Sequence, residues 1–149
     1  MRVSIGSDHR GLSLKTKLIE HLRKLGHQVS DEGPTSDESV DYPDYAASVG
    51  RKIRDGDSEA GILVCGTGIG MSISANKISG VRAALCHDEL TARRSREHNN
   101  SNVLCLAADS LDQPQACELL ETFLATPFAG GRHSRRVEKI NSLDETNIP

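Results

Sequence analysis

The sequence is poor in aromatic residues and lacks long hydrophobic runs. Only 3% of its 149 residues are Phe, Trp or Tyr, and Trp is absent. Proteins that bind single-stranded nucleic acid stack its bases on exposed rings, so this class is nearly excluded. No run approaches the ~18 apolar residues that a membrane span requires. Residues 1–5 also lack the apolar region of a signal peptide.

Neither sign of charge is in large excess, and the cysteines are not grouped. The chain has 18 Lys and Arg against 21 Asp and Glu, a net charge of −3, which indicates neither a nucleic-acid surface nor an acidic tail. The 4 cysteines occur singly, at positions 65, 86, 105 and 117, so neither a zinc site nor a disulfide framework is expected. We therefore expect a reduced, soluble, cytoplasmic protein without a nucleic-acid or membrane partner.

Length and hydrophobic periodicity predict one α/β domain over residues 1–149. Strands are predicted at residues 2–6, 28–30, 60–64, 81–85 and 102–106, and helices at residues 14–25, 44–54, 71–77, 88–97, 114–124 and 132–142. The final residues, about 143–149, are expected to be frayed. Strands that alternate with helices form a parallel sheet covered on both faces, and ligands bind beyond the carboxyl ends of its strands.

A glycine-rich turn, Gly66 to Gly70, follows the third predicted strand. Its glycines allow successive backbone N–H groups to point into one concavity at the start of the next helix, a site that attracts anionic oxygen. A simple tight turn would need the same glycines. The spacing matches neither a dinucleotide fingerprint, which would follow the first strand, nor a P-loop, which needs Lys after its last glycine.

Three side chains near the predicted strand ends are candidates for acid–base chemistry. Cys65 directly precedes the glycine turn, where a thiol has a lowered pKa and can act as a base, although a lone cysteine is more commonly a buried apolar residue. His98 precedes the fifth strand among asparagines and is either a surface-loop histidine or an acid–base group. Asp8 follows the first strand and is either a helix cap or a functional carboxylate.

Arg132 and Arg136 are four residues apart in the last predicted helix, and therefore lie on one face of it. Two converging guanidinium groups suit a phosphate, while a solvated basic face is the ordinary alternative. Arg135 lies off that face and is expected to be solvated. No spacing of His, Cys, Asp or Glu resembles a metal site.

Taken together, several strings of residues resemble the type B ribose 5-phosphate isomerase family, which includes the galactose 6-phosphate isomerase subunits. The resemblance spans nearly the whole chain. Its strings are residues 6–9 (GSDH), 41–43 (DYP), 65–73 (CGTGIGMSI) with 75–77 (ANK), 98–99 (HN) with 102–104 (NVL), and 130–133 (GGRH) with 136–137 (RV). The string from Cys65 to Lys77 is far more specific than its glycines alone.

The resemblance implies a Rossmann-like three-layer α/β/α sandwich with a five-stranded parallel sheet. It also implies the interconversion of ribose 5-phosphate and ribulose 5-phosphate, a step of the non-oxidative pentose phosphate pathway, without a metal or organic cofactor. The implied assembly is a homodimer with active sites at its interface. We therefore expect His98 and the arginines of the last helix to face a neighbour's Cys65.

The resemblance also implies a role for each matching residue. Cys65 would move a proton between C1 and C2, and His98 would open the furanose ring. The other implied site residues are Asp8 and Thr67 near the ring oxygens, the amides of Gly66, Thr67, Gly68, Ile69 and Gly70 at the enediolate, His9, Arg132 and Arg136 at the phosphate, and Tyr42 and Asn99 along the pocket. A mild base, an oxyanion site and a phosphate anchor are what such an isomerisation needs.

Two positions bear on which branch of the family the chain matches. One branch has Ser in place of Cys65 and a Glu base four positions later, where this chain has Ile69, so the thiol branch is matched. Many members carry Arg where this chain has Asp109, which could alter phosphate affinity or sugar preference. Two alternatives stay open: an isomerase of a six-carbon sugar phosphate, such as galactose or allose 6-phosphate, and a non-catalytic sugar-phosphate sensor.

Overall fold

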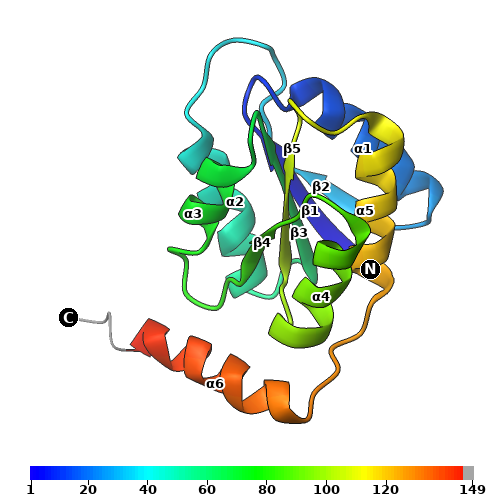
Figure 1. The fold of residues 1–149 in the computed structure, drawn as a ribbon. Coiled ribbons are helices and arrows are strands. Elements are labelled where there is room, and N and C mark those ends of the chain that lie inside the picture. Colours follow the sequence, from blue (N-terminus) through cyan, green and yellow to red (C-terminus); the bar gives the residue numbers. More distant parts are fainter. Residues whose placement is uncertain (146–149) are drawn as a thin grey trace.

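Strands and helices alternate along the chain in the computed structural model, which describes residues 1–145 (Figure 1). The elements are β1 (Arg2–Ser7), α1 (Leu12–Lys24), β2 (Gln28–Asp31), α2 (Tyr42–Arg54), β3 (Ala60–Cys65), α3 (Ile69–Ala75), β4 (Ala83–Leu85), α4 (Glu89–Asn99), β5 (Val103–Ala107), α5 (Gln113–Ala125) and α6 (Arg132–Glu145). Every predicted strand and helix is present.

The five strands form one parallel sheet in the order β2-β1-β3-β5-β4. The chain runs outward from β1 to β2, and then returns to the other side of β1 to form β3. The strand order therefore reverses between β1 and β3. In open parallel sheets such a reversal opens a crevice at the carboxyl ends of the two strands, where ligands bind. Ser7 ends β1 and Cys65 ends β3, so both turns that follow lie at this crevice.

Helices cover both faces of the sheet, as the predicted α/β/α sandwich requires (Figure 1). Successive residues of a strand point to opposite faces. In β3, Ile62 and Val64 pack with α1, α4 and α5, while Leu63 and Cys65 pack with α2 and α3. All six residues of β3 are buried. Cys65 is therefore the last residue of a central strand, on the face covered by α2 and α3.

Three helix ends differ from the prediction in ways that matter for the site. Helix α2 begins at Tyr42 rather than Asp44, because Pro43 fits the first turn of a helix, where its missing N–H is not needed. Helix α3 begins at Ile69 rather than Met71, since Gly68 adopts the left-handed conformation at its N-cap (φ +74°). Helix α4 continues to Asn99, past the predicted end at residue 97.

Helix α6 lies outside the three layers, across the end of the sheet near α4 (Figure 1). Its Val137 is buried, Asn141 accepts a hydrogen bond from Arg82, and Asp144 accepts one from the N–H of Gly80 (2.7 Å). The helix extends to Glu145, so residues 143–145, predicted to be frayed, are helical. Residues 146–149 of that prediction lie outside the described part of the chain.

Candidate active site

The turns after β1, β3 and β5 are joined by backbone hydrogen bonds. The N–H of Asp8 donates to the carbonyl of Val64 (3.2 Å), that of Ala108 to Cys65 (2.9 Å), and that of Asp109 to Gly66 (3.0 Å). The backbone hydrogen bonding of the sheet thus continues beyond the ends of the strands and links all three turns. The side chains on these turns consequently sit on a rigid frame around Cys65.

The sulfur of Cys65 is held by the glycine turn that follows it. The N–H of Gly68 donates to Sγ at 3.1 Å, and the thiol is 4% exposed. This backbone N–H fixes the position of the sulfur within the turn. Gly68 must be glycine for two reasons: its φ is positive, and a Cβ there would lie 2.5 Å from Cδ1 of Leu85.

The amides of residues 66–70 are not all directed at one concavity. The N–H of Gly68 is used by the Cys65 sulfur, and the N–H of Ile69 donates to the hydroxyl of Thr67 at 3.3 Å. These two amides already have partners, and the role of the amides from Gly66 to Gly70 at the enediolate stays a prediction. The turn wraps around the thiol, because Gly68 in the left-handed region points its N–H back toward β3.

A pocket of about 570 Å³ opens beside Cys65. Asp8 is 6% exposed, and its Oδ1 accepts a hydrogen bond from the N–H of Gly11 (2.9 Å). The N-cap of α1 is Gly11, so Asp8 is a pocket residue and not the helix cap. The ring of Tyr42 covers Gly70, where a Cβ would lie 2.6 Å from it. The residues that line this pocket are Asp8, Arg10, Tyr42, Cys65, Gly66, Thr67, Ile69, Gly70, Ile73 and Asp109.

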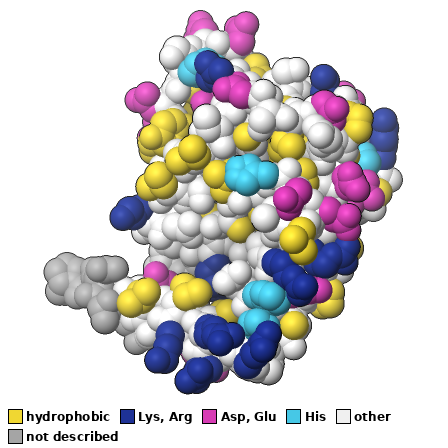
Figure 2. Space-filling view, in the orientation of Figure 1, with side chains coloured by type: hydrophobic (Ala, Val, Ile, Leu, Met, Phe, Trp, Pro, Cys, Tyr) yellow, Lys and Arg dark blue, Asp and Glu magenta, His cyan; other side chains and the backbone are white. Residues whose placement is uncertain are grey.

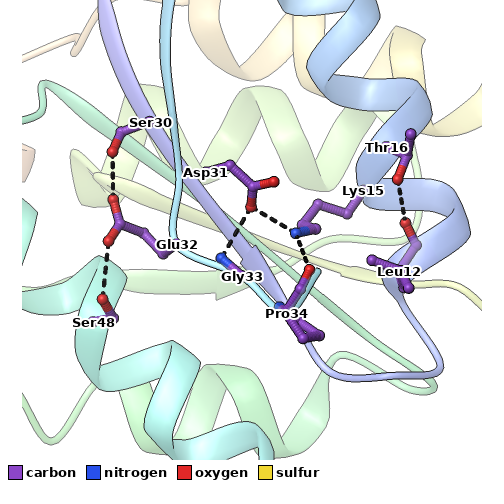
Figure 3. Close-up of polar contacts among 9 residues, drawn as sticks. All are labelled: Leu12, Lys15, Thr16, Ser30, Asp31, Glu32, Gly33, Pro34 and Ser48. Carbon is purple, nitrogen blue, oxygen red and sulfur yellow. Dashed lines mark hydrogen bonds and ion pairs between the residues drawn. The ribbon is translucent and has the colours of Figure 1, made fainter. Parts of the chain in front are cut away.

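The segment between β2 and α2 carries Tyr42 to the pocket and is fixed by Lys15 (Figure 3). Lys15 is 1% exposed, and its Nζ donates to Asp31 (2.6 Å) and to the carbonyl of Pro34 (2.8 Å). Further along the segment, the N–H of Val40 donates to Nδ1 of His9 (3.3 Å). His9 therefore stands beside the pocket with one ring nitrogen occupied.

A second group of candidate residues lies at the end of α4 and the start of α6. The rings of His98 and His133 are stacked, with centroids 4.2 Å apart, and Arg94 donates to Nε2 of His98 (3.2 Å). Since a guanidinium only donates, the neutral His98 ring carries its proton on Nδ1. Arg132 and Arg136 are exposed on α6, as is Arg135. Asn99 is exposed on the last turn of α4.

The two groups lie at opposite ends of the strands. Helix α4 leads into β5, whose first residue, Val103, pairs with Gly61, whereas Cys65 pairs with Ala107 at the other end. Four residues of strand at about 3.3 Å each separate these levels by ~13 Å. The structure thus gathers Asp8, Thr67, Tyr42 and Cys65 in one pocket, with His9 beside it. Within one chain, His98, Asn99, Arg132 and Arg136 are not brought to that pocket.

Basic side chains and histidines gather where α6 lies, at the lower end of the face seen in Figure 2. Partial burial, with the neighbouring charges of His98 and Arg132, lowers the pKa of His133. At the carboxyl ends of the strands, a hydrogen bond and ion pair with Asp109 raise the pKa of Arg10. Burial raises the pKa of Cys86 and of Cys105, which keeps both as neutral apolar residues, as predicted for cysteines outside the turn.

No function was predicted from the sequence for His133, Arg94 or Arg10. Arg94 was detectable, because it lies four residues before His98 on one helix. His133 and Arg10 meet partners that are distant in sequence, and only the tertiary structure brings them together. In the described residues 1–145, no three His, Cys, Asp or Glu side chains are grouped so as to hold a metal ion. None of the described helices has the length and apolar character needed to span a membrane.

Comparisons with known proteins give one consistent result. Residues 3–140 match the ribose/galactose isomerase family model. The chain is 39% identical to ribose-5-phosphate isomerase B of Escherichia coli over 144 residues, which are 97% of each chain. Its structure is similar to those of ribose-5-phosphate isomerase B from Clostridium thermocellum (TM-score 0.98, 42% identity, 99% and 100% of the two chains) and Thermotoga maritima (TM-score 0.93, 48% identity, 95% and 97%).

Proposed function

The chain belongs to the ribose/galactose isomerase family, and from that premise we propose that it interconverts ribose 5-phosphate and ribulose 5-phosphate. The observation that carries this proposal is the thiol of Cys65, which accepts an amide hydrogen bond inside a pocket that also holds a hydroxyl and a carboxylate. An aldose–ketose isomerase needs a base at this place and a polar pocket around it. Because the base is a reduced thiol, we place the activity in the cytoplasm.

Proton transfer between the two carbons is assigned to Cys65. The thiolate takes the proton from C2 of the open-chain aldose, and the electron pair of that C–H bond forms the C1–C2 double bond of an enediolate. The negative charge then rests on the oxygen of C1. Return of the proton from sulfur to C1 moves the double bond to C2–O, and transfer of the C2 hydroxyl proton to the C1 oxygen completes the ketose. The thiolate is regenerated and no other reactant is consumed. Hydrogen-bond donors of the turn, including the Thr67 hydroxyl, are placed to stabilise the developing charge.

Ring opening is assigned to His98. Opening the furanose breaks the bond between C1 and the ring oxygen, delivers a proton to that oxygen and removes one from the hydroxyl of C1. The Nδ1–H of His98 supplies the first proton, since Nε2 is held by Arg94. Asp8 is the buried carboxylate in the pocket that can accept the second. Arg132 and Arg136, with His9, hold the phosphate, as charged donors on a dianion do.

These assignments require a second copy of the chain. His98 and the arginines lie at the opposite end of the strands from Cys65, so one chain offers two half-sites rather than one site. In a symmetric dimer each half-site faces its complement on the partner, and two complete sites result. We propose a homodimer in which Cys65 of one subunit works with His98 and the α6 arginines of the other. The exposed position of Asn99 beside His98 suits the same interface.

The assay that tests the function measures kcat/KM for ribose 5-phosphate beside allose 6-phosphate and galactose 6-phosphate. We expect ribose 5-phosphate to be preferred. A higher kcat/KM for either six-carbon sugar would assign the chain to that substrate instead. Binding of ribose 5-phosphate without conversion would contradict an enzymatic role.

Subunit exchange tests the shared site. Cys65→Ala and His98→Asn variants should each be nearly inactive, but a mixed dimer contains one site with both residues intact. With random exchange, about half of the dimers are mixed, so about a quarter of all sites become active. No recovery after exchange, verified with differently tagged subunits, would show that Cys65 and His98 act within one chain.

A further inference from the structure

Arg10 and Asp109 form an ion pair at the mouth of the Cys65 pocket. Nη2 of Arg10 donates to both carboxylate oxygens of Asp109, at 2.9 and 2.8 Å. Arg10 belongs to the turn after β1, and Asp109 to the turn after β5, whose backbone is bonded to Gly66. The pair therefore bridges the glycine turn that lies between them.

The bridge passes directly over Gly66. A Cβ on Gly66 would lie 2.7 Å from Nε of Arg10 and 2.9 Å from Oδ2 of Asp109. Gly66 has no positive φ, so the absence of a side chain there serves the close approach of this pair. The ion pair thus holds the guanidinium against the first residue of the turn, next to Cys65.

The charges around the pocket make the position of Arg10 important for binding an anionic substrate. Of the residues that line it, Arg10 is the only cation, whereas Asp8 and Asp109 are both carboxylates. A dianionic phosphate entering such a pocket would meet net negative charge if Arg10 were absent. Arg10 also lines the surface pocket that contains His9, so it borders both pockets. Its side chain is 59% exposed, and the donors on Nε and Nη1 are not used in the bonds to Asp109.

We propose that Arg10, held in place by Asp109, binds the phosphate group of the substrate at the mouth of the Cys65 pocket. Arg10 contacts the substrate, and Asp109 is a positioning residue that acts through Arg10. This inference rests on the proposed function, because it takes a sugar phosphate as the ligand. It adds a phosphate contact from the same subunit as Cys65 to those that α6 of the partner provides.

The test compares Arg10→Ala, Arg10→Lys and the matched control Arg54→Ala. Arg54 forms an equally exposed ion pair with Asp55 at the end of α2, away from the pocket. Loss of a charged hydrogen bond to phosphate is expected to raise KM for ribose 5-phosphate about 10-fold to 100-fold in Arg10→Ala, with kcat little changed. The inhibition constant of inorganic phosphate should rise by a similar factor. Arg10→Lys should lie between, since it keeps the charge and loses the planar fork.

A double-mutant cycle separates positioning from simple charge. Asp109→Ala alone should raise KM, because Arg10 is released. In the Arg10→Ala background the same change should lower KM, because it removes an unpaired carboxylate that repels phosphate. Equal effects in both backgrounds would show that Asp109 does not act through Arg10. Unchanged KM and phosphate inhibition in a folded Arg10→Ala protein would overturn the proposal.

Protection of Cys65 from iodoacetate distinguishes this failure from failure of the proposed function. Inorganic phosphate should slow alkylation in the wild-type protein and not in Arg10→Ala. If the wild-type chain shows this protection and does not convert ribose 5-phosphate, the phosphate contact stands and the function does not. If it converts ribose 5-phosphate and Arg10→Ala behaves like wild type, the function stands and the contact does not.

Discussion

The surroundings of Cys65 and those of His98 are built in different ways. Around Cys65 three turns are cross-linked by backbone hydrogen bonds, the thiol is buried, and an amide holds its sulfur. Around His98 the contacts are made by side chains, a ring stack with His133 and a bond from Arg94, at the exposed ends of two helices. The Cys65 region is a preformed pocket, whereas the His98 region is an exposed surface on which basic side chains gather.

The difference indicates which part of the chemistry each region can perform alone. Abstracting a proton from carbon requires a base fixed to a fraction of an ångström, which the rigid frame of β1, β3 and β5 provides. Side chains that come together when two subunits associate can bind a phosphate and protonate a ring oxygen. In the proposed dimer, the preformed half of each site receives its complement from the partner.

The largest expected effect comes from removing the thiol. Cys65→Ala should lower kcat by about 10²-fold to 10⁴-fold with little change in KM, because the lost interaction exists mainly in the transition state. Cys65→Ser should also fail, since a hydroxyl is far less acidic than a thiol. Steady-state kinetics of both variants test this. Near-wild-type turnover of Cys65→Ala would show that another group is the base.

His98 should matter only when a ring must be opened. With ribose 5-phosphate, His98→Asn should lose about 10²-fold to 10⁴-fold in kcat, as expected for loss of an acid–base group. With a four-carbon aldose phosphate, which cannot close to a furanose, the same variant should lose much less. Parallel kinetics with the two substrates measure the difference. Equal losses on both would remove the ring-opening role.

Substitutions on α6 should affect binding rather than turnover. Arg132→Ala and Arg136→Ala should each raise KM by about 10-fold to 100-fold, the value of a charged contact to phosphate. Arg135→Ala is the internal control and should leave KM near wild type. All three arginines are exposed, so their exposure does not separate them and only their places on the helix do. An equal rise in KM for Arg135→Ala would contradict the assignment of faces.

The smallest expected effect is the pH dependence of the histidine stack. Because the pKa of His133 is lowered from its ordinary value of 6.5 in the folded state, the unfolded chain binds a proton first as pH falls. Stability should therefore decline through and below pH ~6.5, and part of that decline should vanish in His133→Gln. Thermal unfolding between pH ~5 and ~8 measures it, with His87→Gln as an exposed control. The same acid-induced decline in His133→Gln and wild type would contradict this coupling.

A feature could be predicted from the sequence when the residues that form it are close together along the chain. The alternation of elements, the position of Cys65 before the glycine turn and the pocket residues near it all depend on neighbours in the chain, and the fold prediction was confirmed. His98 was placed in a loop because asparagines surround it. The helix in fact continues to Asn99, since Asn100 takes the left-handed conformation that ends it (φ 47°).

Features that join distant segments could not be predicted. The Arg10–Asp109 pair and the stack of His98 on His133 depend on strand order and on where α6 packs, and no local pattern carries this information. The use of the Gly68 amide by the thiol depends on one left-handed residue, which the spacing of three glycines does not identify. Asp109 was recognised as a departure from the family pattern, but its partner was not.

The burial of Lys15 gives the protein a built-in reporter of local opening. Its amine is enclosed under the segment that leads to Tyr42 and is bonded to Asp31 and Pro34, so amine-acylating reagents cannot reach it in the closed state. The rate at which Lys15 becomes labelled, compared with an exposed lysine such as Lys24, therefore measures how often this segment lifts from α1. Mass spectrometry of the labelled chain would follow this motion on one side of the pocket without any probe being introduced.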